Sequence, residues 1–156
     1  MKDLKNILER MGYTGITTYI QSGNVIFQNR KKCSKTLAKE IGAKIMQHHG
    51  FEPAVIVLQI RELQTAFENN PFSVQEGKAL HFYFLSAKPE NPDLTKLAKL
   101  KSPTEDFVLD NKVFYLRAPD GIGRSRLAAA IEQNLSVKVT ARNLNTVNKL
   151  ISLAKG

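Results

Sequence analysis

Residues 80–85 read LHFYFL, an unbroken run of leucine and aromatic side chains that is typical of a buried strand. Periodicity and turn residues on its C-terminal side predict, in order, a helix (94–100), a hairpin of two strands (107–109 and 113–116), a helix (127–135), a short strand (137–139) and a closing helix (144–154). Strand, helix, strand, strand, helix, strand is the order of a split βαβ unit. The run at 80–85 is the opening strand of that unit.

The front of the chain repeats this order without an opening strand. The predicted elements there are a helix (4–11), a hairpin of two strands (16–20 and 25–28), a helix (34–49), an apolar strand (54–58) and a further helix (60–67). We therefore predict an α+β fold of two tandem ferredoxin-like split βαβ lobes, with an extra C-terminal helix. Each lobe is expected to have an antiparallel or mixed sheet with helices on one face. Weak periodicity at 71–78 places the lobes at residues 1–78 and 79–156. We expect the chain to begin inside a structural unit, because the first lobe lacks its opening strand.

Composition is that of a globular protein without a membrane segment. Hydrophobic residues make up 42% and charged residues 24% of 156 positions, and no apolar run approaches the roughly 18 residues of a membrane span. The first residues lack the apolar core of a secretory signal. Cys33 is the only cysteine and there are three histidines, a poor set for a disulfide or a metal site. We expect a cytoplasmic protein with no membrane partner, no metal and no cofactor.

The net charge of +9 is concentrated near the C-terminus. After Asn111 there are eight basic residues and two acidic ones, which gives +6: Lys112, Arg117, Arg124, Arg126, Lys138, Arg142, Lys149 and Lys155 against Asp120 and Glu132. Such a field attracts anions, either a small molecule or a nucleic acid. The plainer interpretation is a solvated positive face without a ligand.

Three motifs carry a family resemblance. They are YIQSGNVIF at 19–27, GIGRSRL at 121–127 and TARNLNTVNKL at 140–150. Together with the strand at 80–85 and the order of elements, the chain resembles the bacterial family catalogued as domain of unknown function 1697. The resemblance implies tandem ferredoxin-like units. It implies no catalytic residues, because no activity is established for the family.

Two features depart from the family pattern. Members usually begin with an apolar strand and a glycine-rich loop ahead of the first helix, and this sequence has neither. Either it is a fragment or another segment fills the place of that strand, which lies in the middle of the sheet. Leu144 stands where members often have tryptophan, so burial is kept while an N–H donor is lost.

The strongest candidate site is the basic motif before the helix at 127–135. Gly121 and Gly123 allow close approach of a ligand, and Arg124 and Arg126 offer planar donors on either side of Ser125. Neither this helix nor the closing one has an acid in its first turn. We expect Arg124, Ser125 and Arg126 to converge with Arg142 and Asn143 on one bound anion, which the two glycines allow to come close to the backbone. The alternative is a simple glycine turn with Ser125 as the helix cap.

A second polar group lies at the tip of the first predicted hairpin. One interpretation of Gln21, Ser22 and Asn24 is a rim of hydrogen-bond donors that lines a ligand-binding cleft between the two lobes. Serine and asparagine are also common in turns because they hydrogen-bond their own backbone. Both interpretations remain open from the sequence.

An RNA-recognition domain has the same order of elements, and stacks bases on aromatic residues of its first and third strands. For this alternative we expect His81, Tyr83 and Tyr115 to share one face of the sheet, with Phe82, Phe84 and Phe114 facing the helices. The signature glycine is missing from residues 112–115, KVFY. Burial of His81 and Tyr83 against the other lobe is therefore the favoured interpretation.

Residues suited to catalysis are scattered. Cys33 has no histidine near it in sequence, His48 and His49 end a helix, and Glu105 and Asp106 alternate faces before a strand. We therefore assign no catalytic residue. Two function classes stay open: a binder of an anionic ligand or polyanion, and an enzyme acting on a small phosphorylated or carboxylated substrate in a cleft between the lobes.

Overall fold

The computed structural model describes residues 2–19, 23–28, 33–51, 55–73 and 77–155. Backbone contacts divide the chain into two compact units. The first comprises Met1–Glu62 with Lys149–Gly156, and the second comprises Leu63–Asn148. No helix among the described residues is long and apolar enough to cross a membrane.

The first unit contains a hairpin and two helices. Its elements are α1 (Lys2–Arg10), β1 (Thr14–Tyr19), β2 (Asn24–Gln28) and α2 (Ser34–His49). β1 and β2 pair antiparallel, as predicted. α2 ends at Gly50, whose φ of 77° lies in the left-handed region that glycine accepts readily. The core consists of buried apolar side chains: Ile7, Leu8, Tyr13, Leu37, Ile41 and Ile45.

The prediction of a strand at 54–58 is wrong for the residues of this segment that the structure describes. Residues 55–59 form no strand, and Ala54 lies outside the described residues. Val55 and Val57 nevertheless pack against the core of the first unit. A strand also needs a backbone partner, and apolar composition alone cannot provide one. The corresponding strand of the second unit is paired with the central strand of its sheet, and no such partner is seen among the described residues here.

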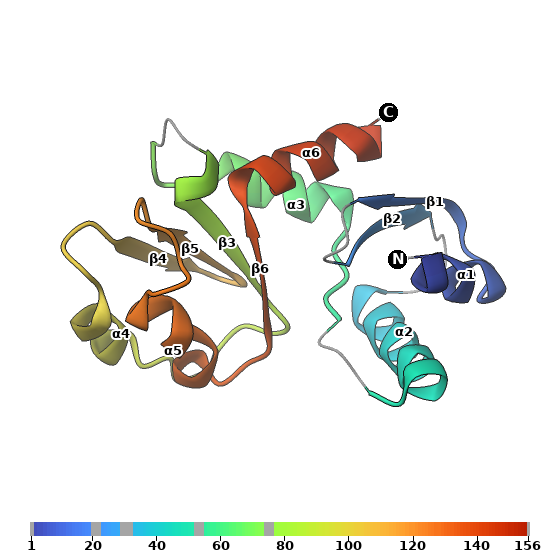
Figure 1. Cartoon of the computed structure of the whole chain (residues 1–156), viewed down its shortest axis with the longest axis horizontal. Helices are drawn as coiled ribbons and strands as arrows, with labels where there is room; N and C mark the ends of the chain where they lie inside the picture. Colours follow the sequence, from blue (N-terminus) through green and yellow to red (C-terminus); the bar gives the residue numbers. More distant parts are fainter. Residues whose placement is uncertain (1, 20–22, 29–32, 52–54, 74–76, 156) are drawn as a thin grey trace. The chain divides into compact units, whose positions relative to one another are not determined.

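The second unit is built around a four-stranded antiparallel sheet (Figure 1). Its elements are η1 (Gly77–Ala79), β3 (Leu80–Leu85), α4 (Leu94–Leu100), β4 (Asp106–Asp110), β5 (Val113–Arg117), α5 (Arg126–Leu135) and β6 (Val139–Asn143). The strand order is β4-β5-β3-β6, so β3 lies between β5 and β6 and is antiparallel to both. The predicted α+β class and the split βαβ order of this part of the chain are confirmed.

Two helices join the sheet to the rest of the chain. α3 (Ile60–Glu68) begins at the end of the first unit and continues into the second, and α6 (Leu144–Lys155) follows β6 directly. β6 is longer and later than predicted, at 139–143 instead of 137–139. Thr140 and Arg142 pair with Phe84 and Phe82 of β3, so backbone pairing extends the strand through polar positions.

One face of the sheet in the second unit packs against α4 and α5. The buried side chains of this core come from both layers: Tyr83, Leu85, Leu97, Phe114, Leu116, Ala118, Leu127, Ile131 and Leu135. Tyr83 lies directly opposite Phe114 in the pairing of β3 with β5, so both point to the helices. The expectation that Tyr83 would share a face with Tyr115, away from Phe114, is therefore wrong. The expectation of burial against the other lobe is also wrong for Tyr83, because the core that buries it belongs to its own unit.

The other face carries Phe82, Phe84 and Tyr115, and it is also covered. Their exposed fractions are 0%, 6% and 1%. The Tyr115 hydroxyl donates a hydrogen bond of 2.7 Å to the carbonyl of Ala66 in α3. The sheet thus has helical residues on both faces, contrary to the expectation of helices on one face only. Its aromatic residues are closed to base stacking, which removes the platform that an RNA-recognition domain needs.

Candidate functional site

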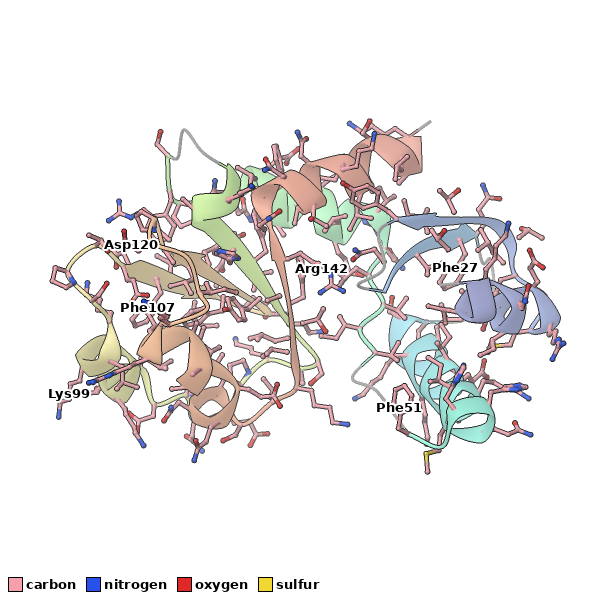
Figure 2. The ribbon with its side chains drawn as sticks, in the orientation of Figure 1. Phe27, Phe51, Lys99, Phe107, Asp120 and Arg142 are labelled. Carbon is pink, nitrogen blue, oxygen red and sulfur yellow. The ribbon has the colours of Figure 1, made fainter. Side chains whose placement is uncertain are left out.

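A surface cavity of about 470 Å³ lies at the start of α5, within the second unit. Three segments form its wall: the end of α4, the turn before β4 and the loop before α5. The lining residues are Lys99, Leu100, Lys101, Ser102, Glu105, Asp120, Gly121, Arg124, Ser125 and Arg126. Figure 2 shows Lys99 on α4 and Asp120 in the loop that follows β5.

Four exposed basic side chains line this cavity. Lys101 forms an ion pair with Asp106, with 3.6 Å between Nζ and Oδ1. Lys99, Arg124 and Arg126 have no acidic partner within 4.0 Å in the part of the chain that the structure describes. Three of the four cations that line the cavity are thus without an ion-pair partner among the described residues.

The floor of the cavity contains a buried carboxylate, Glu105, with an exposed fraction of 7%. Oε1 accepts a hydrogen bond of 2.8 Å from the backbone N–H of Ser102, and Oε2 accepts one of 2.5 Å from the Ser125 hydroxyl. The Ser125 oxygen in turn accepts a hydrogen bond of 3.0 Å from the N–H of Ala128, which caps α5. Glu105 therefore fixes the turn before β4 to the first turn of α5.

Tyr83 lies in the electrostatic field of this carboxylate. Burial, and secondarily the negative charge of Glu105, raise the pKa of Tyr83 to about 12. The phenol is consequently neutral at physiological pH. Tyr83 therefore adds no charge beside the cavity.

A further hydrogen bond ties the two loops of the cavity wall together. The Thr104 hydroxyl donates to Oδ2 of Asp120 over 2.7 Å. Gly121 follows Asp120 with a φ of +88°, a conformation that side chains rarely adopt. The glycine thus serves the loop geometry that brings Arg124 and Ser125 to the cavity. Gly123 is exposed and is not part of the lining.

The structure does not bring Arg142 and Asn143 to this cavity. Arg142 pairs with Phe82 and shares its face of the sheet, whereas α5 lies on the other face. Burial lowers the pKa of the Arg142 guanidinium, whose Nη1 donates to the carbonyl of Ala141 over 2.7 Å. The side-chain oxygen of Asn143 accepts the N–H of Thr146 over 2.9 Å and so caps α6.

The hairpin tip belongs to the first unit. Gln21 and Ser22 lie outside the described residues. Asn24 has an exposed fraction of 7%, and its side-chain amide donates to the carbonyl of Tyr19 over 3.2 Å. That bond closes the hairpin across its turn, which agrees with the turn interpretation of Asn24.

His81 is a polar residue that is buried, as the sequence led us to expect. Its exposed fraction is 9%, and Nε2 has no hydrogen-bond partner among the described residues. Burial lowers the pKa of the imidazole from its usual 6.5, although a hydrogen bond with the backbone of Lys78 opposes this effect. His81 is therefore held as the neutral form.

We expect the protein to become less stable as the pH falls below about 6.5, in part because of His81. The unfolded chain binds a proton there at a higher pH than the folded chain does, so acid favours unfolding. Urea unfolding at pH 7.5 and pH 5.0 measures the loss, which should shrink in His81→Gln. The exposed His48 provides the control, since His48→Gln should leave the loss unchanged. An equal loss in wild type and His81→Gln would contradict the prediction.

A second cavity, of about 650 Å³, lies within the first unit between α1 and α2. It is lined by Ile7, Arg10, Met11, Tyr13, Glu40, Ala43, Lys44, Gln47 and His48. Glu40 already accepts a hydrogen bond of 3.4 Å from the Tyr13 hydroxyl. The cavity at α5 is the stronger candidate, because it combines four cations with a buried carboxylate.

Cys33 also lies in the first unit and is an exposed free thiol. Its sulfur is 3.1 Å from the hydroxyl oxygen of Thr36, and this hydrogen bond lowers the pKa of the thiol. No histidine or acid is shown beside it among the described residues, and no group of three metal-ligating side chains occurs in that part of the chain. The geometry gives Cys33 no catalytic partner there.

Comparison with known proteins supports a family and a fold. Residues 1–115 match the model of a family described as protein of unknown function (DUF1697). No curated protein matches the chain. A solved structure of a conserved bacterial protein from Streptococcus pneumoniae is similar, with a TM-score of 0.66 and 18% sequence identity. That alignment covers 99% of this chain and 88% of the other, and at this identity it shows the fold alone.

Proposed function

The chain belongs to the DUF1697 family of proteins of unknown function, and we propose that it binds a small anionic ligand in the cavity at the start of α5. The observation that carries the proposal is the set of four basic side chains, drawn from two separate segments, around one cavity. Two of them, Arg124 and Arg126, were expected from the sequence to bind an anion.

Charge and size both support a small anion. The lining has four basic and two acidic side chains, so its net charge favours an anion. A cavity of about 470 Å³ is within the range of roughly 300–1,000 Å³ typical of small-molecule sites. The guanidinium groups of Arg124 and Arg126 can each donate two parallel hydrogen bonds to a phosphate or carboxylate.

A polyanion such as nucleic acid is a less specific form of the same proposal. Its support is the positive charge of the segment after Asn111. The covered aromatic face of the sheet argues against base stacking in the second unit. Nucleic-acid binding through phosphates alone would weaken steeply as salt is raised.

We expect the double variant Arg124→Gln/Arg126→Gln to bind inorganic phosphate about tenfold more weakly than the wild type, or worse. Each arginine supplies a charge-assisted hydrogen bond, and the loss of about 1.4 kcal/mol corresponds to a factor of ten. Titration calorimetry at low and at moderate salt measures the affinity.

The matched control removes the same charge away from the cavity. Lys112 and Lys138 are exposed and do not line it, so Lys112→Gln/Lys138→Gln should retain nearly all of the affinity. An equal loss of phosphate affinity in the two double variants would show that binding depends only on the net charge of the protein. Absence of phosphate binding to the wild type at low salt would overturn the proposed function.

A second candidate is an enzyme acting on a small phosphorylated or carboxylated substrate in the same cavity. It is favoured by Glu105, a buried carboxylate beside cations that could hold such a substrate. Turnover in a screen of phosphorylated and carboxylated metabolites, abolished in Glu105→Gln, would support it. Binding without turnover across that screen would contradict the enzyme proposal and leave the ligand-binding proposal standing.

A further inference from the structure

We propose that the ligand of this cavity is zwitterionic, with an ammonium group next to its phosphate or carboxylate. The inference rests on the proposed function and extends it to a ligand class. The anionic group would face the exposed cations, and the ammonium group would face Glu105. The juxtaposition of these opposite charges within one cavity carries the proposal.

Glu105 is a buried carboxylate, and buried carboxylates are usually paired with a cation. The cations that line the cavity do not contact it. Only 7% of the residue is exposed, and its hydrogen-bond donors are the Ser102 N–H and the Ser125 hydroxyl, both neutral. No basic side chain lies within 4.0 Å of it among residues 4–19, 23–28, 33–51, 55–73 and 77–155. A buried carboxylate without a countercharge is costly, so a ligand cation there would be stabilised.

The remaining capacity of Glu105 suits an ammonium group. A carboxylate offers about four lone-pair sites, and the two protein donors occupy about half of them. Asp120 is the second acid of the lining and accepts one hydrogen bond, from the Thr104 hydroxyl. The floor therefore offers negative charge, whereas the exposed parts of Lys99, Arg124 and Arg126 offer positive charge.

O-phosphoethanolamine and propyl phosphate test this directly, because the first carries an ammonium group where the second has a methyl group. We expect wild-type protein to bind O-phosphoethanolamine about tenfold more tightly in calorimetry. Glu105→Gln should reduce this ratio to near one, because it removes the negative charge that the ammonium group would face. Glu132, exposed on α5 and outside the lining, provides the control: Glu132→Gln should preserve the ratio.

The outcomes separate this inference from the function on which it rests. Equal binding of the two compounds to the wild type would overturn the zwitterion inference and leave anion binding intact. Binding of neither compound would overturn both. A preference for O-phosphoethanolamine that persists in Glu105→Gln would show that Glu105 does not recognise the ammonium group, and would also overturn the inference. Circular dichroism of each variant verifies that it is folded.

Discussion

Replacing Phe114 with alanine is expected to lower the free energy of unfolding by about 3–5 kcal/mol. Phe114 has no exposed surface and lies between the sheet and the helices of the second unit. Its ring stacks on Phe107 with 5.1 Å between centroids and meets the edge of Tyr83 at 6.0 Å. Alanine would remove these contacts and leave a cavity that the surrounding strands cannot fill. Urea unfolding of the full chain, followed by circular dichroism, measures the change.

The control is Val108, which lies on the neighbouring strand β4 with 37% of its surface exposed. Val108→Ala should cost about 0.5 kcal/mol or less, as is usual at exposed positions. Similar losses for the two variants would mean that Phe114 is not a core residue. The assignment of Tyr83 and Phe114 to the helix-facing side of the sheet would then be wrong.

Much of the second unit could be predicted because its local patterns agree with its tertiary structure. The run at 80–85 is buried along its whole length, since β3 has a strand on each side and residues packed on both faces. Leu127, Ile131 and Leu135 recur at helical spacing and all enter the core. Central strands and amphipathic helices can be recognised in the sequence, because burial is continuous along the strand and repeats at a regular spacing along the helix.

The orientation of the sheet could not be predicted. In a continuous apolar run, either alternate set of side chains can face the helices. The core that Tyr83 and Leu85 share with the helices shows that odd positions of β3 do so. The failed strand at 54–58 has a related cause. Its apolar residues give burial, as Val55 and Val57 show, but a strand also requires a partner backbone.

Only part of the candidate site could be predicted from the sequence. Gly121, Arg124 and Ser125 were identified from a local motif, whereas Lys99 and Glu105 were missed because they are distant in sequence. A signal for them exists: a hairpin connects β4 to β5, so the start of β4 must lie beside the end of β5. The pairing of Asp106 with Arg117 confirms this neighbourhood. Residues just before β4 and just after β5 therefore belong to one region.

The prediction that Arg142 lies at this cavity was wrong, because its side chain points to the opposite face of the sheet. Neighbouring residues of a strand point to opposite faces. Ala141 packs against the core shared with α5, so Arg142 must point to the other side of the sheet. Similarity of charge and motif cannot reveal this, because it depends on a shift of one residue in the strand.

Replacing Glu105 with alanine is expected to lower the free energy of unfolding by about 2–3 kcal/mol, even without a ligand. Its carboxylate accepts hydrogen bonds from the Ser102 N–H and the Ser125 hydroxyl, and such bonds to a charged group contribute about 1.5–3 kcal/mol. Alanine would leave the Ser102 N–H without its acceptor and would release the turn before β4 from α5. Urea unfolding at pH 7 measures the loss.

A double-mutant cycle with Ser125 distinguishes this structural role from ligand binding. Ser125→Ala alone should cost about 1 kcal/mol or more, because it also removes the cap of α5. Since the two side chains share a 2.5 Å hydrogen bond, the double variant should lose less than the sum of the two single losses. Strict additivity would refute a direct coupling. A Glu105→Ala variant as stable as the wild type would show that the carboxylate does not hold the turn, and would leave ligand recognition as its role.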